Sequence, residues 1–166
     1  MSNEQGIYLR RSSETDIEEL KNAFERSKLL HSKFVDEPGS YEEFIGQEHR
    51  YLVCLQSTDE IVGFYNISEI VKGCFQSAYL GFAAFEPNQR KGFMSKGIQL
   101  LLRIAFDEIN LHRLEANIQP DNIASKNLVK KANFVKEGYS VGYLKISNKW
   151  RDHERWAIIN EDWVDK

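Results

Sequence analysis

Residues 89–97 read Gln-Arg-Lys-Gly-Phe-Met-Ser-Lys-Gly and combine a glycine turn with several cationic side chains. They lie between an apolar run that ends near Phe85 and a stretch with the periodicity of an amphipathic helix. The first N–H groups of a helix lack intrahelical partners and, with the helix dipole, attract anions. Arg90 and Lys91 add two formal positive charges. We therefore predict a site for a diphosphate here, although a plain basic helix start would show the same residues.

A second polar segment, residues 120–128, begins Pro-Asp-Asn and continues into another helical pattern. Asn122 and Ser125 are three residues apart at the predicted start of that helix, so both side chains can face the same side. Their residue types also suit helix capping. The spacing alone leaves both interpretations open.

Together, the two segments resemble the GNAT superfamily of acetyl-CoA-dependent N-acetyltransferases. The pyrophosphate loop of that superfamily reads Gln or Arg, two residues, Gly, one residue, and then Gly or Ala. Gln89 and Gly92 match this pattern, and Met94 replaces the last small residue. The chain looks most like the branch that acetylates the N-terminal alanine of ribosomal proteins, through Ser125 and residues 111–117, 120–122, 137–138 and 150–153.

The resemblance implies which residues hold acetyl-CoA. In the family, the strand before the pyrophosphate loop pairs its backbone with the pantetheine arm, and the asparagine also contacts that arm. The serine of this branch is the proposed proton donor to the leaving thiolate. The implied cofactor-binding residues are Phe82, Ala83, Ala84, Phe85, Gln89, Arg90, Lys91, Gly92, Phe93, Met94, Asn122 and Ser125.

The catalytic base is less clear from the sequence. Where related enzymes carry a glutamate, this chain has Tyr79 and Asn117. Glu115 lies two residues before Asn117, on the same face of a predicted strand, and can reach an amine through a bound water. It is equally suited to pair with Arg113 or Lys136 at the sheet surface.

Two histidines are further candidates for proton transfer, because imidazole exchanges protons near neutral pH. His112 and His153 are both flanked by charged residues, and pairing with these neighbours is the favoured interpretation. We therefore predict Ser125 and Glu115 as the catalytic residues.

The elements that must position these residues follow from hydrophobic periodicity. Strands are predicted at 7–11, 51–56, 61–70, 76–85, 113–118, 134–146 and 150–159, and helices at 13–30, 41–46, 95–108 and 122–132. This order predicts an α/β (α+β) fold with a mixed, mostly antiparallel sheet of about seven strands and about four flanking helices. The resemblance implies a three-layer GNAT-like arrangement, with the sheet splayed for the cofactor between the strands near Phe85 and Ile118.

Length and composition limit the class of protein. The chain of 166 residues, with 42% hydrophobic and 28% charged residues, is predicted to form one domain, residues 1–166. Neither a membrane span nor a signal peptide is evident, so we predict a cytoplasmic protein that does not bind membranes. A net charge of −3 argues against nucleic-acid binding. Cys54 and Cys74 are predicted to be small core residues, and the sequence has no metal-binding pattern.

The predicted function is direct acetyl transfer from acetyl-CoA to an amine, without an acyl-enzyme, by a monomer or homodimer. A weak base favours a protein N-terminal amine, since an α-amine is about a tenth neutral at pH 7, whereas deprotonating lysine costs about 4 to 5 kcal/mol. The acidic stretch 36–48 suits a cationic acceptor. The alternatives are acetylation of a polyamine or aminoglycoside, and a non-catalytic acetyl-CoA-binding regulatory module.

Overall fold

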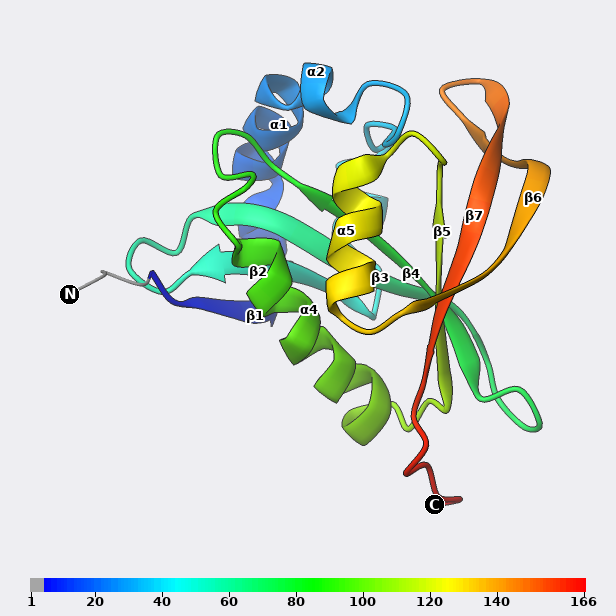
Figure 1. Cartoon of the computed structure of the whole chain (residues 1–166). Helices are drawn as coiled ribbons and strands as arrows, with labels where there is room; N and C mark the ends of the chain where they lie inside the picture. Colours follow the sequence, from blue (N-terminus) through cyan, green and yellow to red (C-terminus); the bar gives the residue numbers. More distant parts are fainter. Residues whose placement is uncertain (1–4) are drawn as a thin grey trace.

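The part of the chain that the structure describes forms seven strands and five α-helices, in the order that the hydrophobic pattern predicts (Figure 1). The structure is a computed structural model and describes residues 5–166. The strands are β1 (Ile7–Arg11), β2 (Arg50–Leu55), β3 (Ile61–Val71), β4 (Ser77–Ala84), β5 (Arg113–Ile118), β6 (Val135–Ile146) and β7 (Lys149–Ile159). The helices are α1 (Ile17–Arg26), α2 (Lys28–His31), α3 (Tyr41–Ile45), α4 (Phe93–Arg103) and α5 (Ile123–Lys131).

Two of the predicted helices differ in detail from those in the structure. The first is interrupted at Ser27, which separates α1 from α2 and whose buried hydroxyl accepts a hydrogen bond from the Glu86 N–H at 3.0 Å. The predicted helix 95–108 begins earlier, at Phe93, and its last part, Ile104–Glu108, is a π-helical turn. The hydrophobic periodicity therefore predicts which elements form, but not where a helix is interrupted.

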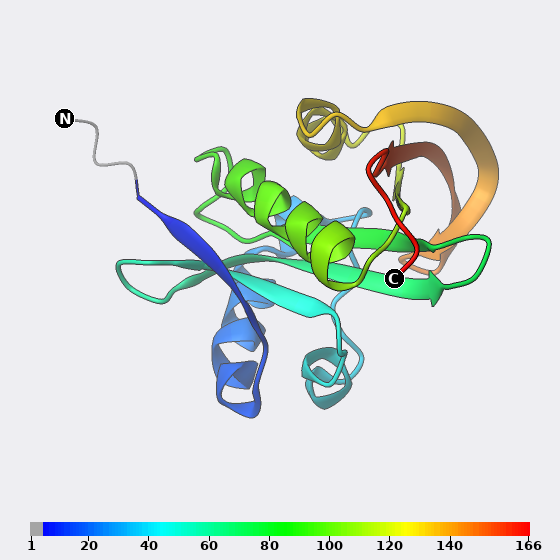
Figure 2. The same cartoon turned by 90° about the horizontal axis from the view of Figure 1, so that it is seen from below.

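The sheet separates two hydrophobic cores, because successive residues of a strand point to opposite faces. Tyr51, Val53 and Leu55 of β2 pack on the face covered by α4 and α5. Leu52 and Cys54 pack on the other face, against α1 and α3. Figure 2 shows α4 and α5 on one side of the sheet and α1 and α3 on the other. This arrangement confirms the predicted three layers.

The two cysteines have different environments. Cys54 is fully buried in the second core, as predicted. The prediction for Cys74 is wrong, because this residue is exposed in the connection between β3 and β4. The apolar residues around Cys74 include Phe75, which is also exposed, so the local composition did not reflect burial.

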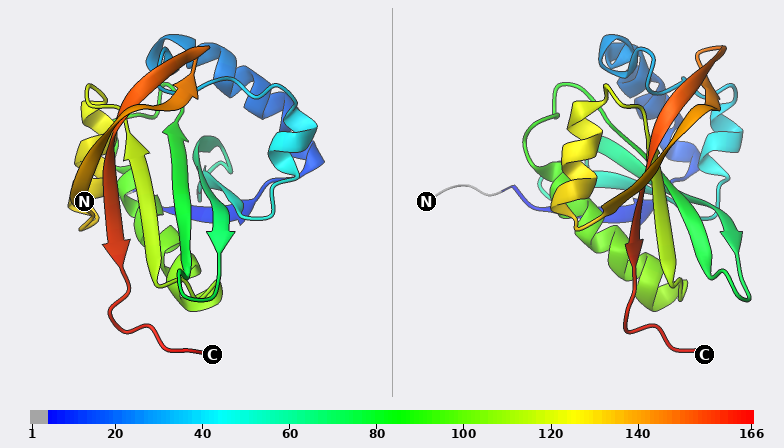
Figure 3. Two further views of the ribbon diagram at one scale, coloured as in Figure 1. Left: turned by 90° about the vertical axis from the view of Figure 1, so that its right-hand side faces the viewer. Right: turned by 45° about the vertical axis from the view of Figure 1, so that its right-hand side comes forward.

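The sheet opens between β4 and β5. Its strand order is β1-β2-β3-β4-β5-β7-β6, and β4 with β5 is the parallel pair. These two strands are paired only along Ser77–Tyr79 and Arg113–Glu115, after which they separate (Figure 3). The remainder of β4 therefore has an open backbone edge on this side. This confirms the predicted splay between the strands near Phe85 and Ile118.

The hairpin of β6 and β7 curves over one side of the opening (Figure 3). Its two-residue turn, Ser147 and Asn148, has φ values of 50° and 58° at the two positions, as a type I′ turn requires. Register shifts between Lys136 and Gly138 and between Ser140 and Leu144 bend β6. The bend brings residues of the hairpin toward the open end of β4 and β5.

Candidate active site

The segment between β4 and α4 has the backbone geometry of an anion site. Gly92, at the N-cap of α4, has a φ of +80°, a left-handed conformation that glycine adopts at little cost. The N–H of Lys96 donates to the Gly92 carbonyl at 3.1 Å, which starts the helical hydrogen bonding. The N–H groups before it in the first turn are therefore open to a ligand. The exposed side chain of Arg90 lies in the same loop.

The side chain of Met94 does not fill this loop. Met94 is partly buried and packs against the core on the α4 face. Its sulfur packs directly against Gly63 of β3. A Cβ added to Gly63 would be only 2.5 Å from Met94 Sδ. The hydroxyl of Tyr65 donates to the Met94 carbonyl at 2.7 Å and fixes the first turn of α4. Gly63 thus makes room for the larger residue of the motif.

The open edge of β4 offers backbone groups to a ligand. The Phe85 N–H donates to the Val62 carbonyl at 2.9 Å, so Phe85 and, by antiparallel alternation, Ala83 are directed to β3. Phe82 and Ala84 are then directed to the open side. His31 Nε2 donates to the Ala84 carbonyl at 2.8 Å, because a carbonyl oxygen can only accept. The backbone groups of β4 that remain open to a ligand are therefore those of Phe82 and the N–H of Ala84, while the side chains of Ala83 and Phe85 are buried.

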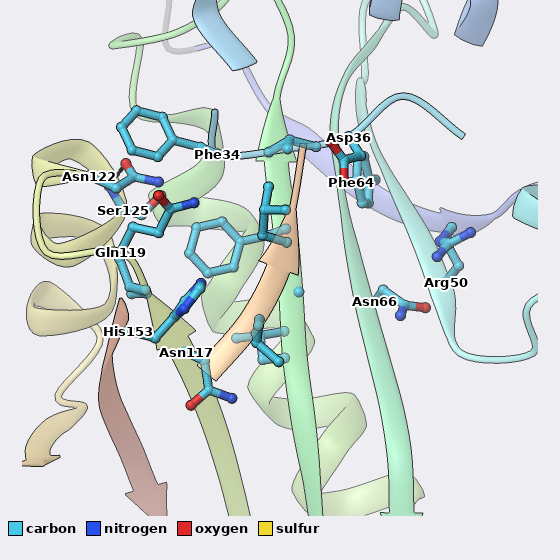
Figure 4. A pocket seen from close by; sticks show the side chains of 17 residues that line it. Phe34, Asp36, Arg50, Phe64, Asn66, Asn117, Gln119, Asn122, Ser125 and His153 are labelled. Atoms are coloured by element: carbon cyan, nitrogen blue, oxygen red, sulfur yellow. Dashed lines mark hydrogen bonds between the residues drawn. The ribbon is translucent and has the colours of Figure 1, made fainter. Parts of the chain in front are cut away.

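A cavity of about 300 Å³ lies at the opening of the sheet (Figure 4). Its lining comes from segments far apart in the sequence, which the fold brings together. It is lined by residues 34–36 after α2, by Arg50, Phe64, Asn66 and residues 80–82 of β2 to β4, by residues 117–119 of and after β5, by Asn122 and Ser125, and by Leu144, Ile146 and His153 of the hairpin. The fold therefore brings Ser125, Asn122 and Phe82 to one cavity.

Asn122 and Ser125 serve the start of α5 as well as the cavity. The Asn122 Oδ1 accepts a hydrogen bond from the Ser125 N–H at 3.3 Å and so caps the helix. Both residues also line the cavity, so capping and ligand contact do not exclude each other. The cap holds the first turn of α5 in place, and with it the position of the Ser125 hydroxyl.

Glu115 is engaged in an ion pair outside the lining of the cavity. Its Oε1 accepts from Arg113 Nε at 2.7 Å, and Arg113 also pairs with Glu137. The two carboxylates raise the pKa of the Arg113 guanidinium above its usual value. The sequence left pairing with Arg113 open, and the structure shows it. The catalytic role of Glu115 stays a prediction.

His153 lies in the cavity wall, although the sequence favoured a surface pairing for it. Its side chain is buried and its ring points into the cavity (Figure 4). The ring Nδ1 is 2.9 Å from the Arg151 carbonyl, which can only accept, so the hydrogen bond assigns the proton to Nδ1. In the neutral ring, Nε2 then carries the free lone pair. In the sequence, His153 is indicated as a site residue only because residues 150–153 resemble the alanine acetyltransferase branch.

The other polar candidates lie differently. Asn117 lines the cavity, and its Oδ1 is buried without a hydrogen-bond partner in the described chain. His112 packs against Trp163, with ring centroids 6.1 Å apart, and does not line the cavity. Of the acidic stretch, Asp36 lines the cavity, whereas Glu42 lies in a separate groove between α1 and α3. The predicted acidic surface is thus mostly directed away from the cavity.

The sequence of residues 7–135 matches the acetyltransferase (GNAT) domain family. The chain is 34% identical over 116 residues to the probable N-acetyltransferase YjcK of Bacillus subtilis, which covers 70% of this chain and 64% of that protein. It is 35% identical over 128 residues to the [ribosomal protein uS5]-alanine N-acetyltransferase of Escherichia coli, covering 76% of this chain and 66% of that protein. The matches thus span just under two thirds of these relatives.

Solved structures show the same fold at lower sequence identity. Mycobacterium smegmatis RimJ in complex with CoA-disulfide has a TM-score of 0.87 and 20% identity, over 98% of this chain and 86% of that one. The spermidine N-acetyltransferase of Vibrio cholerae in complex with CoA and spermine has a TM-score of 0.76 and 23% identity, over 92% of this chain and 95% of that one. Among residues 5–166, no helix is long and apolar enough to cross a membrane.

Proposed function

This chain belongs to the GNAT acetyltransferases, and we propose that it transfers the acetyl group of acetyl-CoA directly to a protein or peptide N-terminal amine. One observation carries the proposal. The Ser125 side chain and the ring of His153, with Nε2 free to accept a proton, line one cavity at the point where β4 and β5 separate. An acid and a base that face one cavity are the groups that aminolysis of a thioester requires.

The residues of the chain would hold acetyl-CoA along two adjacent surfaces. The loop and helix start from Gln89 to Met94 offer N–H groups and two cations to the diphosphate. The backbone of Phe82 and the N–H of Ala84 would contact the pantetheine arm, together with Asn122, which lines the cavity with Phe82. Two relatives of the same fold have been solved with CoA or CoA-disulfide, which supports this cosubstrate.

Ser125 and His153 divide the proton transfers. As the amine nitrogen bonds to the acetyl carbon and the carbon–sulfur bond breaks, His153 Nε2 takes the proton that the amine loses. Ser125 gives its hydroxyl proton to the leaving thiolate and recovers one from solvent. We propose His153 in place of Glu115 as the base, because the Glu115 carboxylate is held by Arg113.

Direct transfer agrees with the positions of the two cysteines. Burial raises the pKa of the Cys54 thiol to about 12, so it has little thiolate character near neutral pH. Cys74 is exposed in the connection between β3 and β4, and neither cysteine lines the cavity. An acyl-cysteine intermediate would need a thiol beside the thioester.

The charges of the cavity favour an α-amine over a polyamine. The lining holds one carboxylate, Asp36, which accepts hydrogen bonds from the N–H and hydroxyl of Ser147 at 2.9 Å each. It also holds the guanidinium of Arg50. A polycation would place further positive charge beside Arg50, whereas an α-amine, with a pKa near 8, requires only one weak deprotonation.

The non-catalytic alternative rested on Met94 and on the absence of a strand carboxylate. Gly63 accommodates Met94, and His153 offers a base from another strand. Thiol release from acetyl-CoA, measured with Ala-starting and Ser-starting peptides, lysine-only blocked peptides, polyamines and aminoglycosides, tests the proposal. We expect turnover with the free-N-terminal peptides. Turnover with polyamines alone, or acetyl-CoA binding without any turnover, would overturn it.

A further inference from the structure

We propose that Arg50 binds a carboxylate of the acceptor. The cavity would then select peptides that carry an acidic side chain on the second or third residue. This inference rests on the proposed function, because it assigns the acceptor side of the same cavity. The chemical class of the ligand is a peptide whose second or third residue is Asp or Glu.

Arg50 is a half-buried cation without a counter-charge. Its Nη1 donates to the Phe44 carbonyl at 2.6 Å, and the guanidinium lies 3.8 Å from the centre of the Phe44 ring. Its Nε is buried and has no hydrogen-bond partner, and no Asp or Glu side chain of residues 5–166 forms an ion pair with it.

Two other partly buried arginines show the contrast. Arg10 binds the Asp16 carboxylate with two hydrogen bonds of 2.7 and 2.8 Å. Arg113 pairs with both Glu115 and Glu137. At Arg50, burial without such a partner lowers the guanidinium pKa to about 10. A desolvated charge is unfavourable until an opposite charge reaches it, and the cavity is where a ligand can supply one.

The strand register places Arg50 at a defined distance from the reacting end of the cavity. Arg50 pairs with Asn66, and Asn66 pairs with Gly81, so the three form one row across β2, β3 and β4. Two strand spacings amount to about 10 Å. A Cβ added to Gly81 would meet nothing within 4 Å, which leaves the floor between the two ends open.

The amine therefore sits at the open edge of β4, near Ser125 and His153, while Arg50 lies on the opposite side of the cavity (Figure 4). One peptide residue spans about 3.5 Å. An α-carboxylate on the reacting residue is too close to the amine to reach Arg50. An acidic side chain on the next residue or the one after it covers the separation.

The alternative is that Arg50 only satisfies the carbonyl of Phe44 in α3. The test compares two pairs of C-terminally amidated peptides that differ only in side-chain charge, Ala-Asp-amide against Ala-Asn-amide and Ala-Ala-Asp-amide against Ala-Ala-Asn-amide, with free alanine and β-alanine as short carboxylates. The enzymes are the unmodified chain, Arg50→Gln, Arg50→Lys and Arg103→Gln, whose exposed arginine on α4 does not line the cavity. The readouts are kcat/KM for each acceptor and the KM for acetyl-CoA.

For the unmodified chain we expect a preference for the acidic peptide of about 10- to 100-fold, the range of a charge-assisted pair. Arg50→Gln should abolish this preference with little change in the KM for acetyl-CoA, Arg50→Lys should keep part of it, and Arg103→Gln should keep all of it. Equal use of acidic and neutral peptides, or loss of activity on both alike in Arg50→Gln, would overturn the proposal.

A second measurement separates this inference from the proposed function. Binding of the acetylated, C-terminally amidated peptides, N-acetyl-Ala-Asp-amide and N-acetyl-Ala-Asn-amide, to the enzyme loaded with CoA can be followed by calorimetry without turnover. Tighter binding of the acidic product that depends on Arg50 supports the inference even if catalysis fails. Equal binding of both products rejects it even if N-terminal amines are acetylated.

Discussion

Replacing Gly63 by alanine should destabilise the protein and weaken its hold on acetyl-CoA together. The new Cβ would lie 2.5 Å from Met94 Sδ and 2.7 Å from the Ala83 carbonyl oxygen. The sulfur can move, but the carbonyl belongs to the backbone of β4. Overpacking of this kind costs about 1 to 3 kcal/mol. For a chain of this size, that loss lowers Tm by about 2 to 12 °C.

The two contacts can be separated with a double-mutant cycle of Gly63→Ala and Met94→Ala. Removing the Met94 side chain relieves the sulfur contact. In the Met94→Ala background, Gly63→Ala should therefore lower the free energy of unfolding by about 1 kcal/mol less than it does in the unmodified protein. Gly63→Ala should still lower the free energy of unfolding in this background, because the contact with the Ala83 carbonyl is unchanged. Urea unfolding gives the stabilities.

The same variants test the cofactor surface. Met94 lies in the first turn of α4 and Ala83 in β4, so a shift at Gly63 disturbs both surfaces that we assign to acetyl-CoA. Titration with CoA should show weaker binding in Gly63→Ala, with a smaller change in the KM of the acceptor. A variant as stable as the unmodified protein, or complete rescue by Met94→Ala, would refute this reasoning.

The remaining predictions concern the acid, the base and the pH dependence of folding. His153→Gln should lower kcat by about 10²- to 10⁴-fold with little change in CoA binding, whereas Glu115→Gln should have a small effect on kcat; the reverse order would restore Glu115 as the base. Ser125→Ala should lower kcat by about tens to hundreds, because a thiolate leaves readily, and unchanged turnover would exclude Ser125 as the donor. Burial lowers the pKa of His31 from 6.5, so the unfolded chain takes up a proton at a higher pH than the folded one. Stability should therefore be complete above about pH 6.5 and decrease as the pH falls below it, and His31→Gln should flatten this dependence in urea unfolding between pH 5 and 8. A steep decrease that persists in His31→Gln would assign it to other groups.

The local structure of the two segments that we assign to the cofactor could be predicted from the sequence, because each segment is short. The loop with Gly92 and the capped start of α5 each act through local backbone geometry, which residue types and spacing reveal. The opening between β4 and β5 could be predicted only from the family resemblance. Its cause, a pairing limited to Ser77–Tyr79 and Arg113–Glu115, depends on long-range register.

The environments of Cys74 and His153 differ from those predicted, and each depends on how distant segments pack. Cys74 lies in a run that looks like a strand but forms the exposed connection after β3. His153 is surrounded by charged residues in the sequence, yet the alternation of β7 turns it into the cavity, while the carboxylate of the next residue, Glu154, pairs with Lys126 and Lys136. The charged residues next to His153 in the sequence therefore did not indicate that its ring faces the cavity.

The acceptor side could not be predicted because side chains from distant strands form it. Arg50 reaches the cavity from β2 and His153 from β7, and no short motif contains both. The surface that we assign to acetyl-CoA, in contrast, consists mostly of backbone groups of β4 and α4. A substitution at Arg50 can thus change which amines are accepted while acetyl-CoA binding is retained. On this proposal, the acceptor depends on side chains outside the short motifs, so those motifs predict the cosubstrate better than they predict the acceptor.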